Sequence, residues 1–155
     1  MCLVMAVASA PSAASEQCRQ LHESRAARVT MSERTGRRPL LRLVALQEEV
    51  IDVQTIEQIL QLTDELLDKG DHFESLWDLR LCKVPGVMVV AKCVRWALAR
   101  KQKLDACNQR MAVCMPDRPA LLAVVRMVLK VFGPVCPVMV SQVEDECEAF
   151  MSPPL

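Results

Sequence analysis

Two aspartates that follow predicted strands are the residues best placed for acid–base chemistry. Asp52 comes after the strand predicted at 40–46, and Asp78 lies near the end of the strand predicted at 73–79. Sites in open α/β sheets gather at the carboxyl ends of strands, where two carboxylates can act as a general acid and a general base. The alternative is structural: Asp52 caps the next helix and Asp78 hydrogen-bonds a neighbouring turn. We favour this alternative and expect no catalytic residue and no enzyme activity, because no other catalytic group accompanies the pair.

The turn after Asp78 offers a second chemistry, the binding of an anion. Lys83 and Gly86 precede a predicted helix, whose first N–H groups have no partner within the helix. A lone glycine is not a phosphate loop, so we favour the competing interpretation, an ordinary helix start. Cys82, beside Lys83, is the thiol in the best position to react. Its competing interpretation, a packed cysteine, is again the one we favour.

Cysteine and histidine offer no obvious metal or cofactor site. The eight cysteines stand at positions 2, 18, 82, 93, 107, 114, 136 and 147, without a C-x-x-C pair. Most lie in apolar runs such as 111–115, so we expect buried, reduced thiols, a reducing compartment and a cytoplasmic location. His22 and His72 are the only histidines and are far apart in the sequence. We therefore expect no zinc site, no Cys–His catalytic pair and no cofactor.

Composition argues against nucleic acid as a partner. Lysine plus arginine equals aspartate plus glutamate at 19 each, so no net field attracts a polyanion. Aromatic residues make up 3% of the chain and tyrosine is absent, which leaves few side chains for base stacking. The longest apolar run, 84–91, ends at Lys92, well short of the roughly 20 residues that a membrane span requires. We expect no transmembrane segment.

The first part of the chain predicts a leader rather than part of the domain. Residues 1–10 are apolar, but no cation precedes them, which argues against a signal peptide. Residues 11–38 are rich in Ser, Ala and Arg and show no clear period, so we expect 1–38 to be disordered. Organellar targeting by this segment stays open, since Arg19, Arg25 and Arg28 occur among small residues. Met31 is an alternative start.

The remaining chain predicts one α/β domain over 39–151, followed by a tail at 152–155. Strands are expected at 40–46, 73–79, 110–115 and 135–140, helices at 53–69, 87–103 and 119–132, and a short final helix after Ser141 that carries Val143, Cys147 and Phe150 on its buried side. Asp52 and Gly70 mark the ends of the first helix, and Pro137 places the last strand at a sheet edge. Ser141 and Glu144 have the spacing of a capping box for the last helix. About four mostly parallel strands alternating with four helices are therefore expected.

This order of elements, with two short motifs, resembles the STAS domain, the SpoIIAA-like family of anti-sigma-factor antagonists. Residues 51–56, IDVQTI, stand where the family has its entry to the first helix, and Asp78 and Leu79 match the Asp-Leu pair that ends its second parallel strand. The resemblance covers roughly residues 39–151. It implies a non-catalytic module for protein interaction or regulation.

One turn departs from the family pattern. Regulatory members of the family place a phosphorylatable serine at the start of the helix after the Asp-Leu strand. Here that turn reads Val84, Pro85, Gly86 and Val87, with no hydroxyl to modify. A kinase-controlled switch of the family type is therefore not expected. Docking of a partner, or of a small anionic or apolar ligand, stays open.

Complementary charges on two predicted helices suggest a partner surface. The helix at 87–103 carries Lys92, Arg95 and Lys103 along one side. The helix at 53–69 carries Glu57, Asp64 and Asp68. One interpretation is two ordinary solvated faces. Our hypothesis is that the basic side docks an acidic protein surface, and self-association through the acidic helix of a second copy is one form of it.

Aliphatic content supports an alternative function, a carrier or sensor of a small apolar ligand. Four methionines suit an irregular cavity, because their side chains are flexible and polarisable; they are Met88, Met111, Met127 and Met139. Methionines at helical or strand spacing also fill ordinary cores, and this interpretation stays open beside the first.

Overall fold

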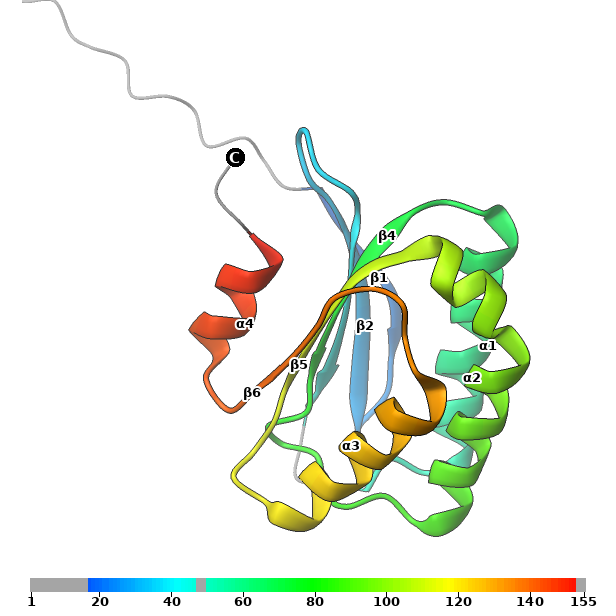
Figure 1. Cartoon of the computed structure of the whole chain (residues 1–155), viewed down its shortest axis with the longest axis vertical. Coiled ribbons are helices and arrows are strands. Elements are labelled where there is room, and N and C mark those ends of the chain that lie inside the picture. Colours follow the sequence, from blue (N-terminus) through cyan, green and yellow to red (C-terminus); the bar gives the residue numbers. More distant parts are fainter. Residues whose placement is uncertain (1–16, 47–49, 153–155) are drawn as a thin grey trace, which may run out of the picture.

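A six-stranded sheet lies at the centre of the computed structural model, which describes residues 17–46 and 50–152 (Figure 1). The strands are β1 (Gln17–Glu23), β2 (Ala27–Glu33), β3 (Leu40–Ala45), β4 (Phe73–Asp78), β5 (Asn108–Cys114) and β6 (Val138–Ser141). They lie side by side in chain order. β1, β2 and β3 pair antiparallel, whereas β3 to β6 pair parallel.

Three helices cover one face of the sheet, and a fourth lies on the opposite face (Figure 1). The three are α1 (Val53–Lys69), α2 (Val87–Cys107) and α3 (Pro119–Phe132), and the fourth is α4 (Glu144–Met151). Crossovers between parallel strands are right-handed, so helices that advance in one direction along a sheet fall on the same face. The prediction of a single α/β domain is confirmed. No helix in the described part of the chain is long and apolar enough to cross a bilayer.

The predicted number and direction of the strands are wrong, because residues 17–33 of the expected leader form two antiparallel strands. On β2, Ala27 and Val29 face the core and alternate with polar residues, a strand period hidden within a segment rich in Ser, Ala and Arg. β1 is mostly exposed and carries no such period. The hairpin between β2 and β3 turns at Gly36, whose φ of 70° suits glycine. The rest of the predicted leader, 1–16, and the tail, 153–155, lie outside the described residues.

The sheet separates two apolar cores of unequal size. The larger core lies under α1, α2 and α3 and includes Leu43, Phe73 and Val113 from the sheet. The smaller core lies under α4; it consists of Leu40, Leu76, Ala112, Cys114, Cys147 and Met151. Neighbours along one strand, such as Leu41 and Leu40, enter different cores because successive side chains of a strand point to opposite faces. The sheet is therefore covered on both sides at β4 and β5.

Local signals in the sequence place the ends of α1 and α3. The Asp52 carboxylate accepts a hydrogen bond of 2.7 Å from the Thr55 backbone N–H, and Gly70 ends α1 with φ 72°. Gly133 ends α3. β6 lies at the sheet edge, as Pro137 predicts.

The capping box predicted for α4 is wrong. Val143 is the N-cap of that helix and makes no side-chain hydrogen bond. Ser141 instead accepts from the Val143 N–H at 3.1 Å and hydrogen-bonds Glu146 rather than Glu144. Glu144 is drawn away because its carboxylate pairs with Arg80. A tertiary ion pair therefore replaces the local cap.

Candidate functional site

The structure does not assemble Asp52 and Asp78 into a carboxylate pair. Asp52 caps α1, on the face of the sheet that carries three helices. Asp78 shares its strand face with Leu76, which packs in the smaller core under α4. Each carboxylate has its own hydrogen-bond partners. The structural roles expected for both residues, a helix cap and a bond to the following turn, are confirmed.

Asp78 is held in a network that joins β4 to α4. Its carboxylate accepts from Arg80 Nε at 2.8 Å and from Arg80 Nη2 at 2.6 Å, and it also accepts from the Arg80 backbone N–H at 3.2 Å. The guanidinium of Arg80 also binds Glu144. Burial raises the pKa of Asp78, but the hydrogen bonds from Arg80 outweigh it and hold that pKa below its ordinary value. The carboxylate stays charged and acts as a structural group.

The turn before α2 has no features of an anion site beyond its free helix end. Gly86 is the N-cap of α2, and its neighbour Lys83 is exposed. Cys82 is buried, and burial raises the pKa of its thiol while Arg118 opposes that effect. A thiol with a raised pKa is a poor nucleophile at neutral pH. Cys82 is therefore not activated, in agreement with the packed interpretation.

The remaining cysteines and histidines of the described chain do not form a reactive cluster. The seven described cysteines are free thiols. Burial raises the pKa of Cys93 to about 11, and burial together with the neighbouring Cys147 raises that of Cys114 to about 11. His72 Nδ1 lies 3.0 Å from the Ala106 carbonyl oxygen. Among the described residues, no group of three or more His, Cys, Asp or Glu side chains is placed to hold a metal ion.

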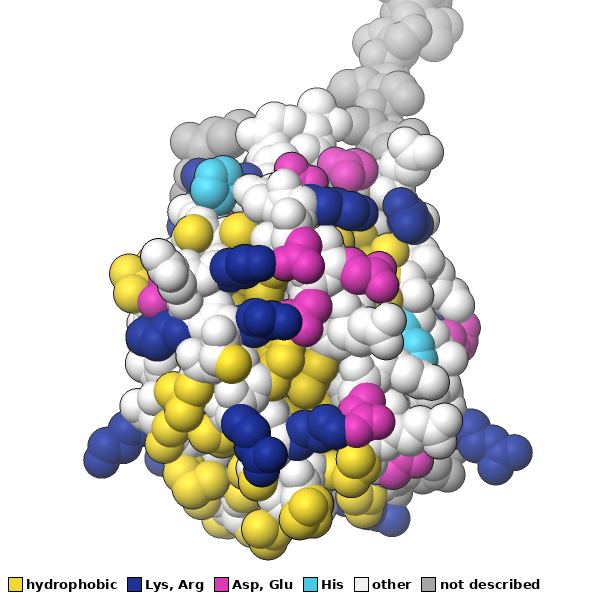
Figure 2. All heavy atoms as spheres, turned by 90° about the vertical axis from the view of Figure 1, so that its right-hand side faces the viewer, with side chains coloured by type: hydrophobic (Ala, Val, Ile, Leu, Met, Phe, Trp, Pro, Cys, Tyr) yellow, Lys and Arg dark blue, Asp and Glu magenta, His cyan; other side chains and the backbone are white. Residues whose placement is uncertain are grey.

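An exposed apolar patch lies at the carboxyl edge of the parallel strands. Val87 is 83% exposed and Met88 is 72% exposed, and both lie in the first turn of α2. Four further exposed apolar residues follow β3 and β4 at the same edge: Val50, Val53, Leu81 and Val84. Figure 2 shows apolar side chains gathered at this end of the molecule. We call these six residues the carboxyl-edge patch.

The predicted partner charges mostly pair with each other inside the chain. Because α1 and α2 lie side by side, three ion pairs link them: Lys92 with Glu57, Arg100 with Asp64, and Lys103 with Asp68. Trp96 Nε1 also donates to Asp64 at 3.1 Å. Figure 2 shows these cations beside the anions of the neighbouring helix. The structure thus gives the acidic side of α1 a partner in its own chain, and it adds Arg100, which the sequence analysis did not single out.

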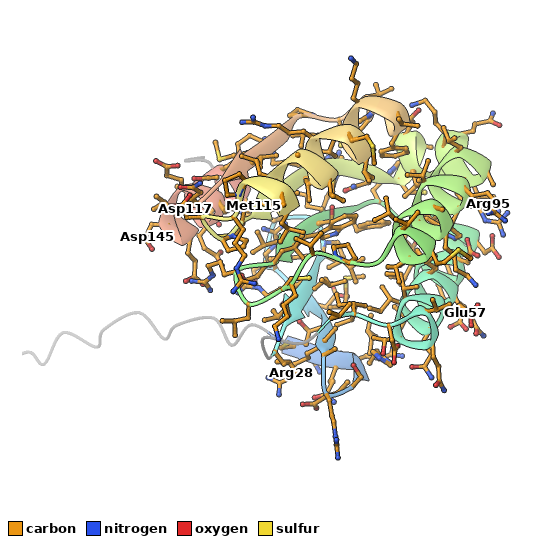
Figure 3. The ribbon with its side chains drawn as sticks, turned by 90° about the horizontal axis from the view of Figure 1, so that it is seen from below. Arg28, Glu57, Arg95, Met115, Asp117 and Asp145 are labelled. Carbon is orange, nitrogen blue, oxygen red and sulfur yellow. The ribbon has the colours of Figure 1, made fainter. Side chains whose placement is uncertain are left out.

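Arg95 is the exception among the predicted basic residues. It is exposed and makes no ion pair with any described residue. Figure 3 shows it on the outer side of α2, pointing away from the body of the domain. Arg95 lies two helical turns beyond Met88, on the same side of α2. It therefore supplies a free cation near the carboxyl-edge patch.

A core pocket of about 200 Å³ lies between the sheet and helices α1, α2 and α3. Aliphatic and aromatic side chains dominate its walls, and Trp77 and Trp96 both line it. Three polar side chains also line it: Thr63, whose hydroxyl donates to the Ile59 carbonyl, and Ser75 and Asn108, which are 2% and 8% exposed. Unfilled space of this size costs on the order of a few kcal/mol of folding free energy, because its walls lose contact partners.

The sequence analysis identified little of the core pocket. Of the four methionines expected to line a cavity, only Met111 does so. Met88 and Met127 are exposed, and Met139 pairs with Ala112 on the opposite face of the sheet. Ser75 and Asn108 were missed, because β4 and β5 bring them together from positions 33 residues apart. The readable signal was a serine on the otherwise apolar inner face of the predicted strand at 73–79.

Comparisons with known proteins leave the family open. No family model, no curated protein and no solved structure matches this chain.

Proposed function

We propose that this chain is a non-catalytic protein-interaction module of STAS-like type that docks a partner through the carboxyl-edge patch. The observation that carries this proposal is the exposure of Val87 and Met88 in the first turn of α2. Water-exposed apolar side chains that gather in one place are typical of interaction surfaces. In the family that the chain resembles, the same turn carries the regulated serine. Here the turn carries apolar side chains in place of that serine.

Two features of the fold support the STAS-like assignment. Strands and helices alternate from β3 to α4, and the parallel strands lie in chain order. Asp78 ends β4 and Leu79 follows it directly, and Asp52 caps α1, as in the positions quoted for the resemblance. These features concern architecture. The regulatory role is our inference from the patch and from the structural roles of both aspartates.

The chemistry around the patch specifies the partner. Lys83 and Arg95 are exposed cations beside it, and the nearby Glu57 is neutralised by Lys92. We therefore infer a protein surface with an apolar centre and acidic residues at its rim. Opposite charges at the rim speed association and fix orientation, while the buried apolar side chains provide most of the affinity.

Substitutions within the patch test the proposal. Val87→Asp and Met88→Asp place a charge on side chains that are already in water, so each variant should fold as the original does. Capture of the partner from cell extract, quantified by cross-linking and mass spectrometry, should weaken by about tenfold for each, because a desolvated charge opposes apolar docking. The matched control is Val135→Asp, an exposed valine (75%) in the loop before β6 at the other edge of the sheet.

Three outcomes would contradict docking of a different protein at this patch. Equal capture by Val87→Asp and Val135→Asp would show that the patch is not the docking surface. A dimer in sedimentation that Val87→Asp dissociates would identify a second copy as the occupant. Binding to vesicles of anionic lipid that depends on Val87 and Lys83 would identify a membrane surface instead.

A second candidate function, a carrier or sensor of a small apolar ligand, is favoured by the core pocket. It does not exclude the interaction module, because no residue of the carboxyl-edge patch lines the core pocket. The two come closest in sequence at Pro85 of the pocket, which is adjacent to Val84 of the patch. We also propose a cytoplasmic location on the basis of the many buried thiols, and cell fractionation tests it.

A further inference from the structure

We propose that the core pocket binds a small, neutral, mostly apolar molecule that carries one hydroxyl, carbonyl or amide group. This inference makes the second candidate function specific, and it does not depend on the carboxyl-edge patch. It rests on the volume of the pocket, on the chemistry of its walls and on one buried polar pair.

The volume sets the size of the ligand. A dry, apolar cavity of about 150 Å³ in another protein is large enough to hold benzene. The core pocket is somewhat larger, about 200 Å³. A single six-membered ring with a short substituent, or an aliphatic chain of similar volume, therefore matches it. A nucleotide or a two-ring cofactor does not.

The walls set the charge of the ligand. Three helices and four strands contribute to them, and none of the side chains that line the pocket is charged. An ionised group without a counter-charge is strongly disfavoured in such surroundings. The ligand is therefore neutral, and its carboxylate analogue is excluded.

Ser75 and Asn108 provide one polar anchor. Asn108 Nδ2 donates to Ser75 Oγ at 3.0 Å, and Ser75 Oγ lies 3.3 Å from Asn108 Oδ1. A side-chain amide has two N–H donors and two acceptor positions on its oxygen, so the pair leaves a donor and an acceptor unused. A ligand hydroxyl, carbonyl or amide matches these positions. Because both side chains are buried at adjacent strands, the anchor is rigid and fixes the orientation of the ligand.

Helices α2 and α3, which cover the pocket, are only partly buried on the sides that line it. Although α3 is the most apolar helix of the described chain, Leu121 is its only fully buried residue. Its pocket-lining residues Val125 and Val128 are half-buried, as are Cys93 and Trp96 of α2 opposite them. Entry between α2 and α3 would therefore separate only half-buried side chains and would leave the sheet in place.

Both tryptophans of the chain line the pocket, so intrinsic fluorescence reports its occupancy directly. The probes are benzyl alcohol, toluene and benzoate, which share one ring and differ in the attached group. Benzyl alcohol should change the tryptophan emission saturably and raise the melting temperature with concentration, because a ligand that binds only the folded state stabilises it. Toluene should bind more weakly, and benzoate should produce neither effect. Absence of a saturable response to benzyl alcohol and toluene alike would overturn the proposal.

Filling the pocket provides the decisive comparison. Cys93→Phe adds a ring inside it, whereas Leu98→Phe adds a similar ring to the exposed side of the same helix. Should Cys93→Phe fail to fold, Val125→Phe and its exposed counterpart Met127→Phe make the same comparison on α3. The filled variants should bind benzyl alcohol about tenfold more weakly than the controls, because the ring occupies the binding volume. Equal binding by filled and control variants would show that the probe binds elsewhere.

The polar anchor has its own test. The double variant Ser75→Ala with Asn108→Leu replaces both hydrogen-bonding partners by apolar groups, which avoids leaving one of them unsatisfied. The ratio of its affinity for benzyl alcohol to its affinity for toluene should fall about fivefold, while toluene should still bind. An unchanged preference would remove the anchor from the proposal. Val87→Asp should leave probe binding intact, and Cys93→Phe should leave partner capture intact, so failure of either function is distinguishable from failure of the other.

Discussion

Asp78 shows how a residue that seems suited to catalysis can serve the fold instead. Its carboxylate receives three hydrogen bonds from Arg80, and Arg80 in turn holds Glu144 at the start of α4. Asp78 therefore links the end of β4 to the helix on the far side of the sheet. Arg42 and Glu148 make a second ion pair between the sheet and α4. Charged residues thus surround the smaller apolar core.

Asp78→Asn tests this structural role through pH. The folded protein holds the pKa of Asp78 below its ordinary value of 3.8, so the carboxylate stabilises the folded state above that value and loses its effect as the pH falls through the folded pKa. At neutral pH the variant should be less stable by roughly 1 kcal/mol, because an amide keeps the backbone bond but loses the ion pair. In urea unfolding, the difference in unfolding free energy between the variant and the original should be complete above about pH 5 and should shrink progressively as the pH falls below 3.8.

The control for this experiment is Asp145→Asn, an acidic residue at the start of α4 that makes no ion pair with any described residue. The free energy of unfolding of this control variant should stay close to that of the original protein throughout the same pH range. A difference for Asp78→Asn that stays constant down to about pH 3 would mean that the charge of Asp78 does not stabilise the fold.

The role of a residue could be predicted where its partner is close in the sequence, and it could not be predicted where the partner is far away in the sequence. The cap formed by Asp52 involves Thr55, three residues away, so the spacing alone indicates it. The bond between Arg80 and Glu144 spans 64 residues, and nothing in either segment specifies it. The pairing of Ser75 with Asn108 could not be predicted for the same reason, because 33 residues separate them in the sequence.

At the scale of elements, the antiparallel strands β1 and β2 contribute unequally to the domain. Ala27 and Val29 of β2 are 0% and 2% exposed and pack beside Leu43 in the larger core. β1 contributes only Leu21 to that core, as a half-buried side chain. β2 is thus part of the folded unit, whereas β1 chiefly covers its edge.

Truncation separates these two contributions. Relative to a chain that begins at Gln17, one that begins at Ser24 lacks β1 and should lose about 1 kcal/mol of stability or less. A chain that begins at Met31 also lacks Ala27 and Val29 and uncovers Leu43. It should lose roughly 4 kcal/mol, because several buried apolar side chains return to water. Thermal and urea melts measure both values.

A chain beginning at Met31 that melts like one beginning at Gln17 would restore the original boundary of the domain at residue 39. The sequence analysis placed that boundary too late because it judged 11–38 by composition. Composition averages over a window, whereas the alternation of Ala27, Val29 and Met31 extends over only five residues. The longer periods of α1 and α3 were read correctly because each repeats over several turns.

At the scale of the whole molecule, part of the balance of 19 cations and 19 anions is expressed as ion pairs between neighbouring elements. Three pairs link α1 and α2 on the outside of the helical layer, and apolar side chains separate one of them from the other two (Figure 2). Pairs of this kind contribute little stability individually, but they specify which helix lies beside which. An acidic helix already matched in this way has little charge left to attract a second copy. This argues against self-association through that surface.

The double change Lys92→Glu with Arg95→Glu tests whether these charges pair within one chain or between chains. Reversal at Lys92 places two anions together at Glu57 and should cost about 0.5–1 kcal/mol of stability, whereas Arg95 has no ion pair with a described residue to lose. Adding Glu57→Lys should restore the lost stability, because it recreates the pair with reversed signs. Sedimentation at low and high salt should show the same oligomeric state for the original, the double variant and the triple variant. A larger species that only the original protein forms, and that salt dissociates, would show that these charges pair between molecules and that Arg95 belongs to that interface.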